Sequence, residues 1–256
     1  MLRLRQICLA APRLEPVVED LQAILGLTVC HRDPGLAAYG LHNALLPVGT
    51  DFLEVVAPLH AGTAAGRFIQ RSQGHGGYMA IFQTDDPTAR QAHASALGVR
   101  TAHQIDHADY QSVQLHPRDC RAAFIELGHS PGGEQRLGNW WPAGPHWQAH
   151  VRYEHTLHLL GIRLESPDPP ALAALWSAIL ASPLGDGDMP DLRMEQATIG
   201  FDPGPADVLG TVVLAVTDPA ANLRRAVDRG LRIEGTDSFH LGGVFFQLRL
   251  DQPPAA

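Results

Sequence analysis

The sequence predicts an α+β fold that repeats one unit four times: a strand, a helix, and then two or three strands. Three observations predict it: an apolar strand leads into a helix start containing Pro, an amphipathic helix follows, and Gly closes the clearest of these helices. Pro is tolerated in the first helical turn, and Gly ends helices in the left-handed conformation. Helix starts of this kind stand at Ala11-Pro12, Asp86-Pro87, Asp168-Pro169 and Asp218-Pro219. Internal repetition of this kind decides the architecture.

Each unit carries the same local signals in the same order. In the first, apolar residues from Leu14 to Leu25 fall at helical spacing and form one stripe. Residues 58–77 predict a short helix and a loop. In the second unit, residues 110–115 and 121–127 alternate or are rich in β-branched side chains, which predicts strands. In the C-terminal pair, the helix starts lie closer together, which predicts a shortened pair of modules.

The predicted domain organisation has four parts. Residues 1–128 form a domain of two modules, 129–154 a connector, 155–251 a second, degenerate domain, and 252–256 a tail. The connector is rich in Gly and Pro yet holds Trp140, Trp141 and Trp147, three of the four tryptophans. Two interpretations stay open. These rings pack the seam between domains, which we favour, or some of them line a ligand pocket.

Composition limits the class of protein. The formal net charge of −8 and the lack of interleaved basic and aromatic residues argue against nucleic acid as a partner. No apolar run approaches the roughly 20 residues that span a bilayer, and no signal peptide is recognised, so a cytoplasmic location with no membrane contact is expected. Three cysteines without metal-finger spacing argue against a disulfide framework. No glycine-rich nucleotide fingerprint occurs, so no nucleotide cofactor is expected.

The repeated modules carry a family resemblance. The stretch Gly40-Leu41-His42-Asn43-Ala44-Leu45, with Phe52-Leu53-Glu54 after it and Ala123-Phe124-Ile125-Glu126-Leu127 closing the second module, resembles the glyoxalase-like domains of the vicinal oxygen chelate superfamily. The resemblance implies βαβββ modules that pair into cup-shaped mixed sheets. It also implies a divalent metal (nickel, manganese, zinc or iron) at the base of the cup.

The resemblance places the family's ligand positions on particular residues. Gln6 and Glu54 stand at the first and last positions of the first module, while Met79 and Glu126 stand at those of the second. The interval from Gln6 to Glu54 nearly equals the interval from Met79 to Glu126. Met79 replaces the usual His, and a thioether prefers softer metals than carboxylates do. His116 ends the strand before that of Glu126, and we predict it as a replacement ligand. The C-terminal pair lacks the ligand residues and is expected to be a structural copy.

The two glutamates have a second interpretation, in which each faces water on an open sheet. A Glu buried in an apolar strand is costly without a partner, and the matching repeat positions favour a functional role. Glu126 is the predicted proton-transferring residue. The predicted substrate-binding residues are Asn43, Tyr78, Met79 and Trp141.

Two functions follow from the resemblance. The first is a metal-assisted lyase or isomerase that acts on a small molecule with vicinal oxygens through an enediolate-like intermediate. The alternative is a metal-free protein that binds or sequesters a small molecule, as in drug resistance; Met79 favours it, whereas Glu54 and Glu126 oppose it. The expected partner is a small-molecule substrate or ligand. A homodimer is left open.

Overall fold

The computed structural model describes residues 1–187 and 189–252 and divides into two compact units. The first unit comprises Met1–Gln6, Met79–Trp141 and Gly161–Gly210, and the second comprises Ile7–Tyr78, Pro142–Leu160 and Thr211–Ala256. Of the predicted tail, 252–256, only Gln252 lies within the described residues. The predicted domain boundaries at residues 128 and 155 stay a prediction.

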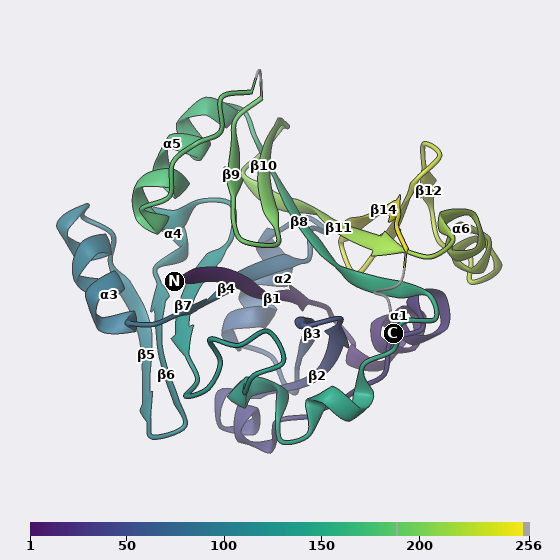
Figure 1. The fold of residues 1–256 in the computed structure, drawn as a ribbon, viewed down its shortest axis with the longest axis horizontal. Helices are drawn as coiled ribbons and strands as arrows, with labels where there is room; N and C mark the ends of the chain where they lie inside the picture. Colours follow the sequence, from purple (N-terminus) through teal and green to yellow (C-terminus); the bar gives the residue numbers. More distant parts are fainter. Residues whose placement is uncertain (188, 253–256) are drawn as a thin grey trace. The chain divides into compact units, whose positions relative to one another are not determined.

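The predicted repeats are confirmed (Figure 1). The first module consists of β1 (Leu2–Ala10), α1 (Leu14–Leu25), β2 (Leu41–Val48) and β3 (Asp51–Pro58). The second consists of β4 (Gly77–Thr84), α3 (Pro87–Ala96), β5 (Thr101–His107), β6 (Tyr110–Leu115) and β7 (Phe124–His129). The third consists of β8 (Thr156–Ser166), α5 (Pro169–Leu180), β9 (Asp191–Arg193) and β10 (Thr198–Pro203). The fourth consists of β11 (Val208–Val216), α6 (Pro219–Asp228), β12 (Ile233–Glu234), β13 (Ser238–Leu241) and β14 (Val244–Leu250).

Short helices lie between these elements. They are η1 (Pro34–Tyr39), α2 (Ala64–Arg71), α4 (Pro117–Cys120), η2 (Trp141–Ala143) and η3 (Trp147–His150). The predicted short helix within residues 58–77 is therefore α2. Both η2 and η3 lie in the Trp-rich connector, which otherwise has no helix or strand among the described residues apart from the last residue of β7 at its start.

Three of the four module helices begin as their sequence signals predict. The carboxylates of Asp86, Asp168 and Asp218 each accept a hydrogen bond from the backbone N–H three residues on, and Pro occupies the first turn of each helix. Helix α1 differs, because its N-cap residue Arg13 makes no side-chain capping bond. Its amphipathic stripe, from Leu14 to Leu25, is buried and holds it in place instead.

In the first unit, β5, β6, β7 and β4 pair in that order. Val113 of β6 lies opposite Leu127 of β7, and α3 contacts both strands, so one face of these strands is an apolar core covered by the helix. Residues alternate between the two faces of a strand, and Glu126 therefore lies on the other face. In the same unit, β8 pairs in parallel with β10, and Trp176 of α5 packs edge-on against Phe201.

In the second unit, β2 pairs antiparallel with β3, while β11, β14, β13 and β12 pair in that order. Helices α1 and α6 contact each other, and Arg229 of α6 forms an ion pair with Asp20 of α1. The hydroxyl of Thr156 donates to the carbonyl of Leu25, which ties the start of β8 to the end of α1.

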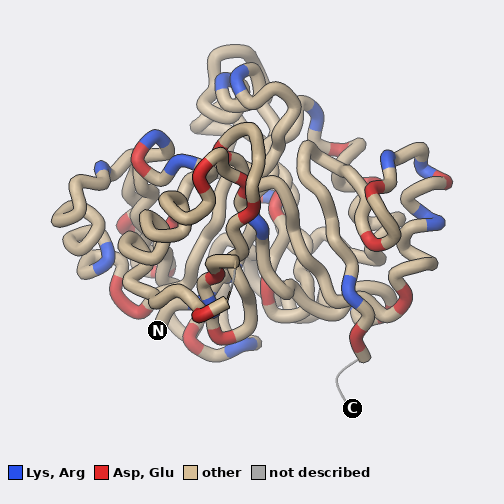
Figure 2. Tube along the Cα trace, turned by 90° about the horizontal axis from the view of Figure 1, so that it is seen from above, with Lys and Arg blue, Asp and Glu red and all other residues tan. Residues whose placement is uncertain are grey.

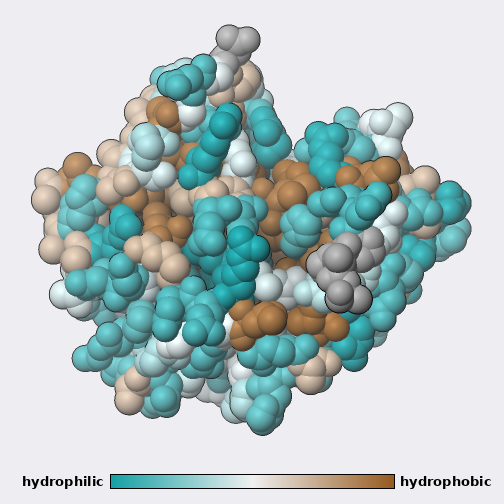
Figure 3. All heavy atoms as spheres, viewed as in Figure 1, coloured by the Kyte–Doolittle hydropathy of each residue, from teal (hydrophilic) through white to brown (hydrophobic). Residues whose placement is uncertain are grey.

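Positively and negatively charged residues are interspersed along the chain (Figure 2). The sequence holds no lysine, so the basic residues other than histidine are all arginines. Apolar residues reach the surface in separate groups between hydrophilic ones (Figure 3). Among the described residues, no helix is both long enough and apolar enough to cross a membrane.

Candidate functional site

Glu126 is a buried carboxylate held by two neutral donors. Its side chain lies on β7 and is 5% exposed. The Tyr110 hydroxyl donates to Oε1 at 2.6 Å, and Nε2 of Gln114 donates to Oε2 at 2.8 Å. Gln114 lies directly opposite Glu126 in the β6–β7 pairing, so the strand register itself positions this donor. Both oxygens are thus oriented before any ligand arrives.

Gly128 makes room for Tyr110. A Cβ atom at this position would lie 2.4 Å from the Tyr110 hydroxyl oxygen and 2.9 Å from the ring carbon that carries it. Tyr110 can therefore lean across the strand to reach Glu126 only because residue 128 has no side chain. Its backbone lies opposite Ser112 in the same antiparallel pair.

Trp140 and Trp141 cover this face of the sheet. Trp140 is 0% exposed, its indole N–H donates to Oε1 of Gln6 at 2.7 Å, and its ring meets that of Tyr110 edge-on at 5.6 Å. The Trp141 ring stacks in parallel on Tyr110 with centroids 5.6 Å apart, yet it remains 38% exposed. We call the surface formed by Gln6, Tyr110, Gln114, Glu126 and Trp140 the Glu126 face.

Arg5 anchors the segment that carries these rings. Its guanidinium donates to the carbonyls of Arg136 and Gly138 at 3.0 and 3.3 Å, and lies 5.8 Å from the centre of the Trp140 ring. The backbone N–H of Trp141 donates to the Ser130 hydroxyl at 3.0 Å. The connector is therefore fixed at both ends of the Trp140 region rather than acting as a free linker.

Met79 lies on the same face of the sheet as Glu126. It stands opposite Phe124 in the parallel β4–β7 pair, two residues before the Glu126 position, and is buried. Period-two alternation places both side chains on one side of the sheet.

His116 lies at the connection between β6 and β7 and caps α4. Its Nδ1 accepts from the backbone N–H of Arg118 at 3.3 Å and lies 3.4 Å from a guanidinium nitrogen of Arg100. Arg100 also pairs with Asp119 at 2.7 Å, and its hydrogen bonds hold the pKa of that carboxyl well below its usual range. His116 thus belongs to a local cap, and its role as a metal ligand stays a prediction.

The second unit contains the other predicted residues. Nδ2 of Asn43 donates to Oε1 of Glu54 at 2.7 Å, and Oδ1 of Asn43 accepts from the backbone N–H of Asp33 at 2.8 Å. Both side chains are buried. Tyr78 packs against Phe68 with ring centroids 4.9 Å apart. Burial raises the pKa of the Tyr78 hydroxyl, and the negative charge of Glu54 adds to this effect, so Tyr78 is a neutral donor at physiological pH.

The third tryptophan of the connector also packs inside a unit. Trp147 of η3 is buried and meets Phe52 edge-on at 4.9 Å, in the second unit. Trp140 and Trp147 therefore each fill the interior of one unit, and Trp141 alone keeps an exposed surface. Both open interpretations of the three rings, the seam and the ligand pocket, stay predictions.

The arrangement of the predicted ligands can be tested against a divalent metal. Oε1 of Gln6 accepts from Trp140, and the two oxygens of Glu126 accept from Tyr110 and Gln114, so a metal would compete with three donors for these oxygens. Met79 adds only a thioether. No group of three or more His, Cys, Asp or Glu in the described part of the chain is arranged to hold a metal ion. As arranged, the residues of the first unit do not fit a hard divalent cation, and the predicted set Gln6, Glu54, Glu126 and His116 stays a prediction.

The sequence did not single out Tyr110 or Gln114 as site residues, and it left Trp140 open between the seam and a ligand pocket. A signal was present for two of them, because Tyr110, Ser112 and Gln114 alternate along β6 and must share a face. That they lie next to Glu126 depends on the β6–β7 register, which no local pattern gives. Trp140 is placed by a contact with Gln6, far away in the sequence.

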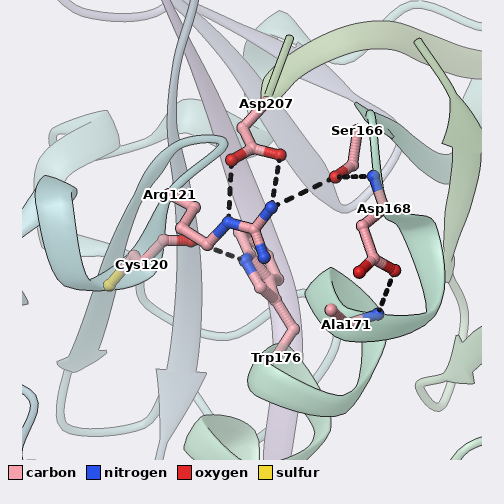
Figure 4. Close-up of polar contacts among 7 residues, drawn as sticks. All are labelled: Cys120, Arg121, Ser166, Asp168, Ala171, Trp176 and Asp207. Atoms are coloured by element: carbon pink, nitrogen blue, oxygen red, sulfur yellow. Dashed lines mark hydrogen bonds and ion pairs between the residues drawn. The ribbon is translucent and has the colours of Figure 1, made fainter.

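A second polar cluster joins the second and third modules inside the first unit (Figure 4). Arg121 donates twice to Asp207, at 2.7 and 2.8 Å, and once to the Ser166 hydroxyl at 3.2 Å. Burial alone would raise the pKa of Asp207, but the hydrogen bonds from Arg121 and Ser166 outweigh it and hold that pKa below its usual value. Nearby, the Trp176 indole N–H donates to the carbonyl of Cys120 at 2.9 Å. The cluster is a structural tie.

Comparisons with known proteins agree with this fold. A family model described as a glyoxalase-like domain matches residues 7–180. No curated protein is significantly similar in sequence. Among solved structures, a hypothetical protein from Staphylococcus aureus aligns over 98% of this chain and 100% of its own, with a TM-score of 0.66 and 11% identity, which shows a shared fold.

Two shorter structures align with half of the chain. A variant methylmalonyl-CoA epimerase from Streptomyces coelicolor, in complex with 2-nitronate-propionyl-CoA, is 26% identical over 50% of this chain and 96% of its own, with a TM-score of 0.45. A methylmalonyl-CoA epimerase from Mycobacterium tuberculosis is 21% identical over 50% of this chain and 87% of its own, with a TM-score of 0.44.

Proposed function

Because this chain belongs to the glyoxalase-like domain family, within the vicinal oxygen chelate superfamily, we propose that it binds a small organic molecule at the Glu126 face without a metal. One observation carries the proposal. Glu126 is buried, and both of its oxygens accept hydrogen bonds from uncharged groups, Tyr110 and Gln114. A buried carboxylate with neutral donors keeps lone pairs for a ligand that brings its own O–H or N–H groups.

The aromatic rings supply the rest of the proposed site. Tyr110 offers apolar surface next to the carboxylate, as ligand sites in proteins commonly do. In this proposal, the ligand takes the place of the Trp140 ring and donates to the amide oxygen of Gln6 in place of the indole N–H. Trp141, which stacks on Tyr110 and is partly exposed, marks the side from which the ligand enters.

Glu126 also keeps its predicted chemical role in this proposal. Its lone pairs lie beside the bound molecule, so the carboxylate can take up a proton from an acidic O–H or C–H of that molecule. Tyr110 and Gln114 fix the orientation of the carboxylate and would hold it in place while the proton moves.

The metal-assisted lyase or isomerase is the second candidate function. It is favoured by the parallel between Glu54 and Glu126, which stand at matching strand positions and are both buried. Each also accepts a hydrogen bond from a side-chain amide, Glu54 from Asn43 and Glu126 from Gln114. It requires Gln6 and Glu126 to exchange their present donors for a metal. We derive no reaction step from it.

The proposal is tested by screening small organic acids, hydroxyketones and planar aromatic compounds for a rise in thermal midpoint. The screen uses the native protein, Glu126→Gln, and Glu134→Gln as a matched control on the exposed part of the connector. In Glu126→Gln the Tyr110 hydroxyl can accept from the new amide, so the variant should fold. We expect at least one compound to stabilise the native protein and the control but not Glu126→Gln.

Two results would count against the proposal. In the first, compounds stabilise Glu126→Gln as strongly as the native protein, which would place their site elsewhere. In the second, no compound in any of the three classes stabilises the native protein.

A further inference from the structure

A surface hollow of about 300 Å³ lies at the far end of the β5–β6 hairpin, in the first unit. Asp106, His107, Tyr110, Gln111, His129 and Pro131 are among the residues that line it. This volume is at the lower end of the range for small-molecule sites, about 300 to 1,000 Å³. None of the residues predicted from the sequence to act in a site lines it.

Strand register sets Asp106, Gln111 and His129 in one row. Asp106 of β5 pairs with Gln111 of β6, and Gln111 pairs with His129 of β7. Residues paired across strands share a face of the sheet. Glu126 is three positions before His129 on the same strand, so it lies on the opposite face. The row therefore lies on the other face from Glu126, and Tyr110 is the one residue of the Glu126 face that also lines the hollow.

The row presents hydrogen-bond acceptors. Nδ1 of His129 lies 3.0 Å from the carbonyl oxygen of Thr84, which can only accept, so Nδ1 carries the hydrogen and a neutral ring keeps Nε2 as an acceptor. Nε2 of Gln111 donates to Oδ1 of Asp106 at 3.0 Å. This leaves Oδ2 of Asp106 and Oε1 of Gln111 as further acceptors, one of them on a charged group.

We propose that this hollow binds a small organic cation that carries several N–H donors, an ammonium or a guanidinium group. Such a group matches three acceptors and one negative charge, and hydrogen bonds between ionised partners are the strong ones. Asp109, in the adjacent turn, does not line the hollow but adds negative charge near it, because its carboxylate lies 3.6 Å from Nδ1 of His107, which does line it. The charge of Asp106 makes the hollow less favourable for anions, which it repels.

The test uses propylammonium and methylguanidinium as probes, with xylitol as a neutral donor-rich compound and phosphate as an anion. Binding is measured at physiological ionic strength by ligand-observed saturation-transfer NMR. Asp106→Asn removes the charge inside the hollow while keeping an acceptor for Gln111. Asp109→Asn removes the same charge just outside it and is the matched control. Equal thermal midpoints for the three proteins show that each is folded.

We expect one or both cations to bind the native protein and Asp109→Asn with similar affinity. Asp106→Asn should bind at least about tenfold more weakly, which corresponds to the loss of one charge-assisted hydrogen bond. Glu126→Gln should bind the cations nearly as the native protein does, because its side chain lies on the other face and reaches the hollow only through its hydrogen-bond partner Tyr110.

Three results would overturn the proposal. Neither cation binds the native protein; xylitol or phosphate binds as well as the cations; or Asp109→Asn weakens binding as much as Asp106→Asn, which would show attraction to a general negative surface.

Discussion

Gly128 shows how one residue can decide the geometry of the Glu126 face. Any side chain there would meet the Tyr110 hydroxyl, since even a Cβ atom would stand 2.4 Å from its oxygen. The hydrogen bond from Tyr110 to Glu126 depends on this gap. The absence of a side chain at Gly128 of β7 therefore makes the space that Tyr110 of β6 fills.

Gly128→Ala should push Tyr110 away from Glu126. We expect a loss of about 1 to 3 kcal/mol in the free energy of unfolding, typical of an overpacked site, measured by urea denaturation. The compounds that stabilise the native protein in the screen should lose most of their effect. Gly187→Ala is the control, because a Cβ atom there makes only an ordinary contact at 3.5 Å. Unchanged stability in Gly128→Ala would show that Tyr110 is not held as described.

At the scale of the element, helix starts were predictable because their signals are local. An Asp followed by Pro is sufficient to cap a helix wherever the chain is otherwise helical, and Asp86, Asp168 and Asp218 all do so. Strand register is different. Whether Gln114 lies opposite Glu126 or one residue away depends on the β6–β7 connection through α4, and a slip of one residue would move the side chain to the other face. The strand of Glu126 was therefore predictable, whereas its two donors were not.

Strand β13 carries a histidine that should make the second unit sensitive to acid. His240 is half buried, and its ring meets Phe245 at 5.2 Å. Burial lowers the pKa of His240, and the positive charges of Arg232 and His75 lower it further. The unfolded chain, with an ordinary histidine pKa of about 6.5, therefore binds a proton more readily than the folded one.

We expect stability to fall as the pH drops from about 7 through the ordinary histidine range, because protons favour the unfolded state there. His240→Gln should lose less stability than the native protein between pH 8 and pH 5.5, as measured by urea denaturation at each pH. His60→Gln, an exposed histidine of the same unit, serves as the control. If His240→Gln lost as much stability between pH 8 and pH 5.5 as the native protein, the proposed effect of His240 would be contradicted.

At the scale of the whole molecule, each compact unit is assembled from segments far apart in the sequence. The first unit joins the start of β1 to the second and third modules, and the second joins the first and fourth modules. Repetition in the sequence predicts the modules, since each repeats the same local signals. It does not predict which modules pack together, because packing depends on side chains that meet only after folding.

The connector shows most clearly that local sequence does not predict packing partners. Its Gly and Pro content predicts irregular structure, which holds outside the short helices η2 and η3 and the end of β7. Its tryptophans predict burial, which holds for Trp140 and Trp147. Nothing in residues 129–154 indicates that Trp140 meets Gln6 or stands against Tyr110. The contact with Trp140 makes Gln6 a hydrogen-bond acceptor.

The central claim is that the Glu126 face binds its ligand without a metal. It is tested most directly by the metal content of the untagged protein, measured by plasma mass spectrometry after incubation with nickel, manganese, zinc and iron and removal of free ions. The account predicts well under one equivalent of any metal, with no difference between the native protein and Glu54→Ala/Glu126→Ala. One equivalent of a single metal in the native protein, lost in that double variant, would contradict the account and establish the metal-assisted enzyme instead.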